Sequence, residues 1–306
     1  MKKKLVLLNQ SVLFFDLLMV LIIFVLSICL ANYLGAAVNF AGFLLGWLSA
    51  CLLLIALQLM DFYGLPERQL DDDHRLFSRV FPGLLSANNA KGAGSQYRGL
   101  ILLLIFLGGW AILQYVMLQL HMLPVSALWL LALTMIVVLL AGMPAAGSIR
   151  NGYRELLQAL LIFGVFPAYA YTSTAGEFHI LILLISFPMA FFYLSWRIAH
   201  SLFRYADDQR NGKSNLLQRL GWKRGMTVHN LFILISFVLY ACIPIAGYPS
   251  NIFLNAILSF PLGLLLIVMM FRIERGKKPE WQSVMVLEKI SILLMAYFLA
   301  AAMILR

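Results

Sequence analysis

The stretch YADDQRNGKSNLLQRLG, at residues 205–221, combines two adjacent carboxylates with several cations and two glycines. Its Gly-Lys-Ser triplet, which begins at Gly212, resembles the end of the phosphate-binding loop G-x-x-x-x-G-K-[ST]. That loop needs a glycine five residues before Gly212, where this chain has Asp207, and it follows a β-strand. The phosphate-loop interpretation therefore fails. Two interpretations remain for the stretch: a charged loop that does chemistry, and a solvated connector whose charges only anchor the topology.

The chain that carries this stretch has the composition of a membrane protein. Its 306 residues are 62% hydrophobic and 12% charged, whereas about a quarter of residues are charged in soluble domains. Apolar runs of about 20 residues, long enough to cross a bilayer, occur at roughly 10–32, 36–60, 98–117, 123–146, 155–175, 178–199, 228–248, 251–271 and 284–305. We therefore expect an all-α polytopic membrane protein, one domain over residues 1–306, with nine transmembrane helices around a central cavity.

The distribution of basic residues predicts the orientation of these helices. Cytoplasmic segments of membrane proteins are enriched in Lys and Arg. With the N-terminus in the cytoplasm, every Lys and Arg except Lys289 and Arg306 falls in or beside a cytoplasmic segment, and nine spans place the C-terminus outside. The net charge of +10 is explained by topology and by contact with anionic lipid headgroups. We therefore expect no nucleic-acid partner.

Two of the predicted cytoplasmic loops, 61–97 and 199–227, are long and carry most of the acidic residues, whereas the outer connections are short. Long loops in compact proteins commonly carry function. We expect these two loops to form a cap over a cavity that receives a water-soluble headgroup from the cytoplasm and a hydrophobic tail from the bilayer. Within the second loop, Leu216, Leu217 and Leu220 share one helical face, which predicts a short interfacial helix.

Ionisable residues inside or beside the predicted spans are further candidates. Asp16 lies within the first span, where a carboxylate is costly unless it faces a cavity or a partner; the alternative is an interfacial residue that water reaches. Glu288 and Lys289, at the start of the last span, are interpreted as an interfacial pair. His229 is interpreted as a solvated or interfacial residue rather than a metal ligand.

The segment DDQRNGKSNLLQRLG (207–221) resembles the second aspartate-rich signature of the UbiA superfamily of intramembrane prenyltransferases, approximately D-x-x-x-D-x-x-x-G-K-x-T-L-x-x-R-L-G. Upstream, ELLQALLIFGVFPAYAYTSTAGEF (155–178) is similar to the GEL…FFG…GTYY…TG stretch of the branch that prenylates dihydroxynaphthoate for menaquinone synthesis. LQLMDFYGLPERQ (57–69) lies where the family has its first signature, N-D-x-x-D-x-x-x-D. The resemblance covers most of the chain.

This resemblance implies an activity and a set of site residues. Family members are expected to transfer a polyprenyl group from a diphosphate donor to an aromatic or other lipid acceptor, with Mg²⁺ held between the two acidic signatures. Asp61 and Asp208 match the family's catalytic carboxylates. The implied metal ligands are Asp61, Asp207 and Asp208, and the implied diphosphate ligands are Lys213, Arg204, Arg68 and Arg210.

The chain departs from both signatures. Gly64, Arg68 and Arg204 stand where the family has further carboxylates. Two interpretations stay open. Either Glu67 and Asp71, just downstream, return acids to the metal site, or the two arginines bind the diphosphate directly, since arginine matches the geometry of phosphate oxygens.

Three functional classes follow from these features. The first is an active prenyltransferase. The second is a non-catalytic relative that binds a quinone, a pigment or an isoprenoid lipid, or that serves as a subunit of a larger membrane complex. A transporter is least favoured, because the sequence shows no internal repeat and few polar residues within the spans. In each case we expect an integral protein of the bacterial inner membrane, in contact with membrane lipids.

Overall fold

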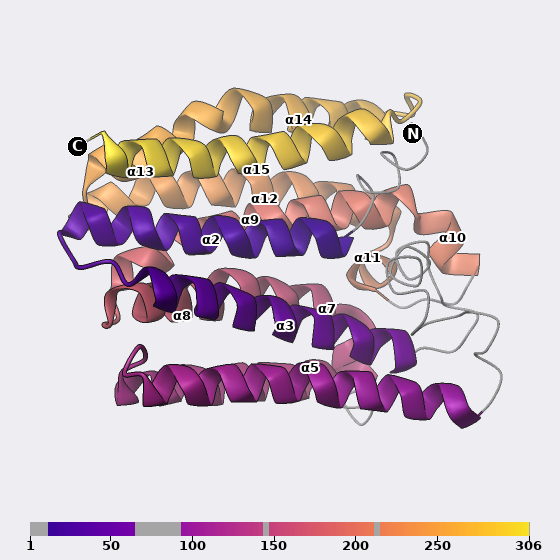
Figure 1. Cartoon of the computed structure of the whole chain (residues 1–306). Helices are drawn as coiled ribbons and strands as arrows, with labels where there is room; N and C mark the ends of the chain where they lie inside the picture. Colours follow the sequence, from indigo (N-terminus) through magenta and orange to yellow (C-terminus); the bar gives the residue numbers. More distant parts are fainter. Residues whose placement is uncertain (1–11, 65–92, 143–146, 211–214, 306) are drawn as a thin grey trace, which may run out of the picture.

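The computed structural model describes residues 12–64, 93–142, 147–210 and 215–305. All regular secondary structure in these ranges is helical, and the long helices run side by side along one axis (Figure 1). The elements are α2 (Val12–Leu34), α3 (Phe40–Gly64), α5 (Ala93–Gln119), η3 (Val125–Ala127), α6 (Leu128–Gly142), α7 (Gly147–Leu160), η5 (Leu161–Val165), α8 (Phe166–Ala175), α9 (Ile180–Phe203), α10 (Tyr205–Arg210), α11 (Leu216–Leu220), α12 (Trp222–Cys242), η6 (Ile243–Ala246), α13 (Ser250–Ala256), η7 (Ile257–Ser259), α14 (Phe260–Glu274) and α15 (Trp281–Ile304). The predicted all-α class is confirmed.

Within the described ranges, eight helical segments are long and apolar enough to cross a membrane. They are Val12–Leu34, Phe40–Leu59, Ile101–Gln119, Tyr153–Ala175, Ile180–Phe203, Trp222–Ala246, Ser250–Glu274 and Trp281–Ile304. The remaining predicted span, 123–146, falls on α6, whose apolar stretch Leu128–Leu140 is shorter. The structure therefore supports an integral membrane protein with eight candidate spans.

The predicted loop 199–227 is shorter in the structure, where residues 204–221 lie between two candidate spans and contain two short helices. Helix α9 continues to Phe203, α10 follows almost at once, and α12 begins at Trp222. The short helix predicted after the charged stretch is present as α11, and it packs against α7 and α12. Most of the other predicted loop, residues 65–92, lies outside the described residues.

One end of the bundle gathers the elements that carry the charged stretch. Helices α10 and α11 lie there, beside the end of α3 and the start of α5 (Figure 1). We call this the α10 end. The chain reaches it again at the starts of α2, α7, α12 and α15 and at the end of α9. Residues near these helix ends are therefore brought together from distant parts of the sequence.

Two local features let the helices pack closely. Gly42 and Gly46 on α3 face Ser173 on α8, and a Cβ at Gly42 would collide with the backbone oxygen of Ser173. Small residues allow such close approach between membrane helices. Before α8, the chain forms one π-helical segment, η5, and Pro167 supplies no N–H for the Phe163 carbonyl four residues earlier. The hydroxyl of Ser186 on α9 donates to that carbonyl at 2.9 Å instead.

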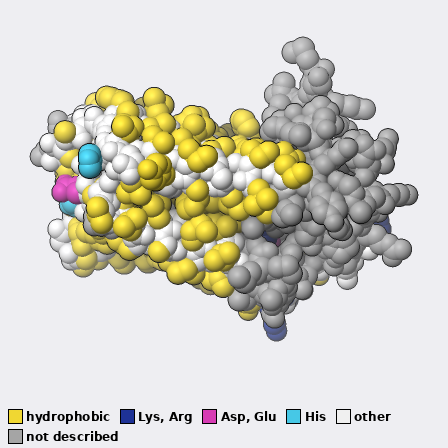
Figure 2. All heavy atoms as spheres, turned by 60° about the horizontal axis from the view of Figure 1, so that its bottom comes forward, with side chains coloured by type: hydrophobic (Ala, Val, Ile, Leu, Met, Phe, Trp, Pro, Cys, Tyr) yellow, Lys and Arg dark blue, Asp and Glu magenta, His cyan; other side chains and the backbone are white. Residues whose placement is uncertain are grey.

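The outer surface of the bundle is apolar. Figure 2 shows hydrophobic side chains over most of the described surface, with acidic and histidine side chains near one tip and Lys or Arg side chains towards the other. Large exposed apolar residues occur on many of the long helices, among them Leu104, Ile112, Val238 and Leu258. This distribution is typical of a protein whose lateral surface contacts lipid.

Candidate functional site

The charged stretch forms two short helices joined at a buried carboxylate. Asp208 on α10 is 5% exposed, and its Oδ2 accepts a hydrogen bond from Nδ2 of Asn215 at 2.8 Å. Asn215 also caps α11, because its Oδ1 accepts from the backbone N–H of Gln218 at 2.8 Å. One asparagine therefore ties the predicted catalytic carboxylate to the start of the next helix.

The predicted diphosphate ligand Arg204 lies between α9 and α10 and is half-buried. Burial lowers the pKa of its guanidinium below the usual range, and the nearby carboxylates of Asp208 and Asp207 oppose that shift. Asp207 and Arg210 are exposed. A cation and two carboxylates are thus close together in the signature, with only Asp208 shielded from solvent.

The other predicted site residues lie at the edge of the described ranges or outside them. Asp61 belongs to the last turn of α3, at the α10 end. The remaining predicted ligands lie outside the described residues: Lys213, Glu67, Arg68 and Asp71.

The described residues offer a limited fit to the Mg²⁺ that the resemblance implies. Asp207 and Asp208 supply hard oxygen ligands, but no group of three or more His, Cys, Asp or Glu able to hold a metal occurs among the described residues. Mg²⁺ commonly binds through one or two carboxylates and completes its shell with water and substrate phosphates.

A second polar centre lies inside the bundle, beneath the charged stretch. Asp16 on α2 has no exposed surface. Its Oδ1 accepts from the Tyr193 hydroxyl at 2.6 Å and its Oδ2 accepts from Nε2 of Gln158 at 2.7 Å. Of the two interpretations of this carboxylate, the one with a buried partner is confirmed, and the interfacial one is wrong. Helices α2, α7 and α9 are joined through a single side chain.

Two arginines accompany this carboxylate. Arg154 on α7 and Arg197 on α9 are half-buried, and both interact electrostatically with Asp16 and with each other. The Arg197 guanidinium also lies over the ring of Trp196, 5.9 Å from its centroid. Like charges in a partly desolvated place repel each other strongly. Asp16 offsets part of that repulsion, and Glu155 is a second carboxylate beside Arg154.

A narrow recess connects this centre to the charged stretch. It is too narrow to admit a water molecule. Its lining comes from α7, α9 and α11: Glu155, Leu194, Arg197, Ile198, Ser201, Leu216 and Leu217. Helix α11 therefore closes one side of the recess. Its residues Leu216 and Leu217, which were predicted to face the lipid interface, pack over Glu155 and Arg197 instead. We call the recess and the side chains of Asp16, Arg154, Gln158 and Tyr193 the α7 centre.

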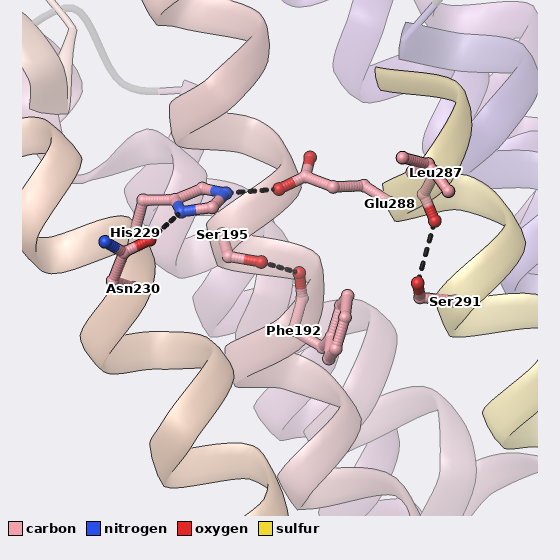
Figure 3. A network of polar contacts seen from close by, with 7 residues as sticks. All are labelled: Phe192, Ser195, His229, Asn230, Leu287, Glu288 and Ser291. Atoms are coloured by element: carbon pink, nitrogen blue, oxygen red, sulfur yellow. Dashed lines mark hydrogen bonds and ion pairs between the residues drawn. The ribbon is translucent and has the colours of Figure 1, made fainter. Parts of the chain in front are cut away.

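A third polar group links α12 to α15 (Figure 3). His229 and Glu288 have no exposed surface, and their Nε2 and Oε1 atoms lie 2.5 Å apart. The other ring nitrogen of His229 lies 2.9 Å from Oδ1 of Asn230. The predictions of a solvated or interfacial His229 and of an interfacial Glu288 were therefore wrong. These residues form a buried polar contact between α12 and α15.

Sequence reasoning missed most members of the α7 centre. A signal existed for Arg197, because it lies inside a predicted span, where a charge is costly and commonly functional. Arg154 lies at the edge of its predicted span and was assigned only to topology. Gln158 and Tyr193 give no such signal, since an uncharged polar residue in a helix can face lipid, protein or cavity.

Comparison with known proteins does not extend the assignment. No protein-family model matches the sequence, and a search of curated protein sequences gives no match. The resemblance to intramembrane prenyltransferases therefore stays a prediction.

Proposed function

We propose that the protein binds the diphosphate of a polyprenyl donor at the α10 end and transfers the prenyl group to an aromatic or other lipid acceptor. The observation that carries the proposal is the pair of half-buried, mutually repelling arginines, Arg154 and Arg197, beneath the charged stretch. Asp16 and Glu155 are the carboxylates beside them. A ligand with several phosphate oxygens would add further partners for these cations, because guanidinium groups pair with phosphate in charge-assisted hydrogen bonds.

The arrangement suits the chemistry of prenyl transfer. The bond between C1 of the donor and its diphosphate oxygen breaks, and the bonding electron pair leaves with the diphosphate. Cations fixed near that oxygen stabilise the developing negative charge. The carbon then bonds to the acceptor, which loses a proton. Leu216 and Leu217 of α11 shield the buried charges from water, and an allylic carbocation requires that shielding.

Mg²⁺ would bind the diphosphate together with the arginines. When bound, the ion neutralises phosphate oxygens as a Lewis acid. Asp208, Asp207 and Asp61 are the residues that would hold it. The hydrogen bond from Asn215 to one oxygen of Asp208 fixes the orientation of this carboxylate.

The membrane arrangement belongs to the same proposal. We assign the α10 end to the cytoplasmic face of a bacterial inner membrane, with the N-terminus inside and the C-terminus outside. Helix α6 then serves as the ninth transmembrane segment, and the helices enclose a cavity for the isoprenoid chain. The charge distribution along the sequence supports this orientation.

A non-catalytic lipid-binding role is the second candidate. It is favoured by Arg204, a cation that interacts with both Asp208 and Asp207 where a metal would compete for the same carboxylates. In that case the diphosphate or another anionic headgroup is held by arginines alone, and a partner protein of the membrane uses the bound isoprenoid or quinone.

Donor binding tests the proposed function. Purified protein in detergent is titrated with geranylgeranyl diphosphate and with geranylgeraniol, which differ only in the headgroup. We expect the diphosphate to bind at least about tenfold more tightly, and Arg197→Gln to lose about 10- to 100-fold of that affinity, as expected for a charged hydrogen bond. The control is Arg224→Gln, an exposed arginine of α12. Equal binding of the two lipids would refute the headgroup assignment.

A further inference from the structure

The last turns of α14 and the connection to α15 form a cationic pocket at the α10 end (Figure 1). The pocket encloses about 110 Å³, which is enough space for several water molecules. Two of its lining residues are apolar and four are charged: Met269, Ile273, Arg272, Lys277, Lys278 and Glu280. Because three cations face one carboxylate, the lining carries an excess of positive charge.

The backbone at the end of α14 holds two of these cations close together. Gly276 has a φ of +86°, the left-handed conformation that glycine adopts just after a helix. The N–H of Lys277 donates to the carbonyl of Arg272 at 3.0 Å, and the N–H of Gly276 donates to the carbonyl of Ile273 at 2.9 Å. These bonds form a Schellman motif, in which the positions of Arg272 and Lys277 commonly carry apolar side chains in contact. Here the motif brings together two like charges instead.

The pocket cations are not neutralised by the protein. Among the residues that the structure describes, no ion pair joins a carboxylate to Arg272, Lys277 or Lys278. Cations at this place do agree with the partial negative charge of a helix C-terminus and with a cytoplasmic loop. Neither effect requires the cations to surround one cavity. Their arrangement around the pocket is better explained by an anion that binds there.

The surface of α14 that leads to the pocket is apolar. Leu264 and Val268 are 48% and 45% exposed. They precede Arg272 at intervals of four residues, so the three side chains follow one another along the same side of the helix. Large exposed apolar side chains on a membrane helix contact acyl chains. An acyl chain that lies along this side of α14 therefore ends at the pocket.

Two tryptophans mark the level of the pocket in the membrane. Trp281 follows Glu280 directly at the start of α15. Its ring meets the ring of Trp222, at the start of α12, edge to face, with 5.7 Å between the centroids. Tryptophan is enriched where a membrane protein crosses the level of the lipid headgroups. The pocket thus lies where a phospholipid has its phosphate.

We infer that this pocket binds the phosphate of an anionic phospholipid, whose acyl chains lie along the exposed apolar side of α14. Arg272 and Lys277 donate charge-assisted hydrogen bonds to the phosphate oxygens. A zwitterionic lipid such as phosphatidylcholine fits less well, because its ammonium group adds a further cation to the pocket. The site is separate from the proposed diphosphate site, since none of its lining residues belongs to that site.

Lipid binding to the purified full chain in a neutral detergent tests the inference. The probes are dioctanoyl phosphatidylglycerol and dioctanoyl phosphatidylcholine, which share their acyl chains and differ in headgroup charge. Native mass spectrometry measures the two dissociation constants. We expect phosphatidylglycerol to bind at least about tenfold more tightly. The double variant Arg272→Gln, Lys277→Gln should lose about tenfold or more for phosphatidylglycerol and little for phosphatidylcholine.

The matched control is the double variant Lys223→Gln, Arg224→Gln. It removes two exposed cations from the start of α12, at the same end of the bundle, and leaves the pocket lining unchanged. We expect its affinity for phosphatidylglycerol to change by less than about twofold. An equal loss in the two double variants would overturn the inference, because it would mean a general attraction to the basic surface. Equal affinity of the unchanged protein for the two lipids would also overturn it.

Two further measurements keep the test decisive. Arg272 and Lys277 are exposed, so the pocket variant should fold, and thermal unfolding without lipid should match that of the unchanged protein. Inorganic phosphate in about tenfold excess should leave phosphatidylglycerol bound, because the free ion lacks the apolar contacts with α14. Displacement by inorganic phosphate would assign the pocket to a soluble anion and contradict the lipid site.

Discussion

Several buried polar side chains in this protein join helices that are distant in the sequence. Asp16 connects three helices, His229 and Glu288 connect two, and the Tyr169 hydroxyl connects α8 to Gln114 on α5. Each pair is far apart in the sequence, and a bilayer offers no competing water. Such contacts fix which helices are neighbours.

Removing the Tyr193 hydroxyl tests the contribution of the Asp16 centre. Tyr193→Phe takes away one of the two hydrogen bonds to a buried carboxylate and leaves the ring in place. We expect the free energy of unfolding to fall by about 1–2 kcal/mol, at the upper end of hydrogen bonds between membrane helices. Thermal unfolding in detergent measures the change. Tyr297→Phe, at a ring that is 63% exposed, is the control and should have no effect.

A double-mutant cycle tests the contact between His229 on α12 and Glu288 on α15. Replacing either His229 or Glu288 by Leu leaves the other polar group buried without its partner, and we expect a loss of about 3 kcal/mol or more. The double variant removes both polar groups, so its loss should be smaller than the sum of the single losses. Additive losses would mean that the two side chains do not stabilise each other.

At the scale of elements, α11 packs closely on α12. A Cβ at Gly225 of α12 would collide with Cδ1 of Leu217, so glycine there leaves room for this leucine side chain. The same device operates between α3 and α8 at Gly42 and Gly46. Glycine residues thus allow close packing at α3 and α12, two helices beside the candidate site residues.

Alanine scanning of glycines tests this packing. Gly42→Ala forces a Cβ against the backbone of Ser173, which cannot yield as a flexible side chain would, and we expect a loss of about 1–3 kcal/mol. Gly108→Ala in α5 is the matched control, because nothing lies within 4 Å of its new Cβ. That change should be neutral or stabilise by about 0.5–1 kcal/mol through helix propensity. Equal effects at both sites would contradict the packing argument.

Much of the fold could be predicted from the sequence, because hydropathy over 20 residues directly reflects the solvent of a membrane helix. The apolar runs gave the long helices, and the leucine pattern gave α11. Hydropathy did not predict α10, because a helix of this length is too short to give a hydropathy signal. It also did not predict the contact between His229 and Glu288, because a polar residue near the end of a span looks the same in the sequence whether it faces water or another polar residue. Pairing requires knowledge of which helices are neighbours.

For the whole molecule, the two ends of the bundle should lie on opposite sides of the membrane. Lys223→Cys lies near the α10 end, and Glu177→Cys lies after α8 at the opposite end; both native side chains are exposed. A membrane-impermeant maleimide applied to intact cells should label the cysteine at 177 and spare the one at 223, with the unchanged protein as background. Labelling of residue 223 from outside would reverse the proposed orientation.

The central claim is that this chain transfers a prenyl group, and product formation tests it most directly. Purified protein is incubated with labelled geranylgeranyl diphosphate and a panel of hydroxylated aromatic acceptors, with Mg²⁺ or with chelator, and prenylated product is measured. We expect product that requires Mg²⁺ and that falls at least about 100-fold in Asp208→Asn, since a metal ion held by this carboxylate would stabilise the charge that develops on the leaving diphosphate. Retention of the diphosphate without product from any acceptor would contradict the claim and favour the non-catalytic lipid-binding role.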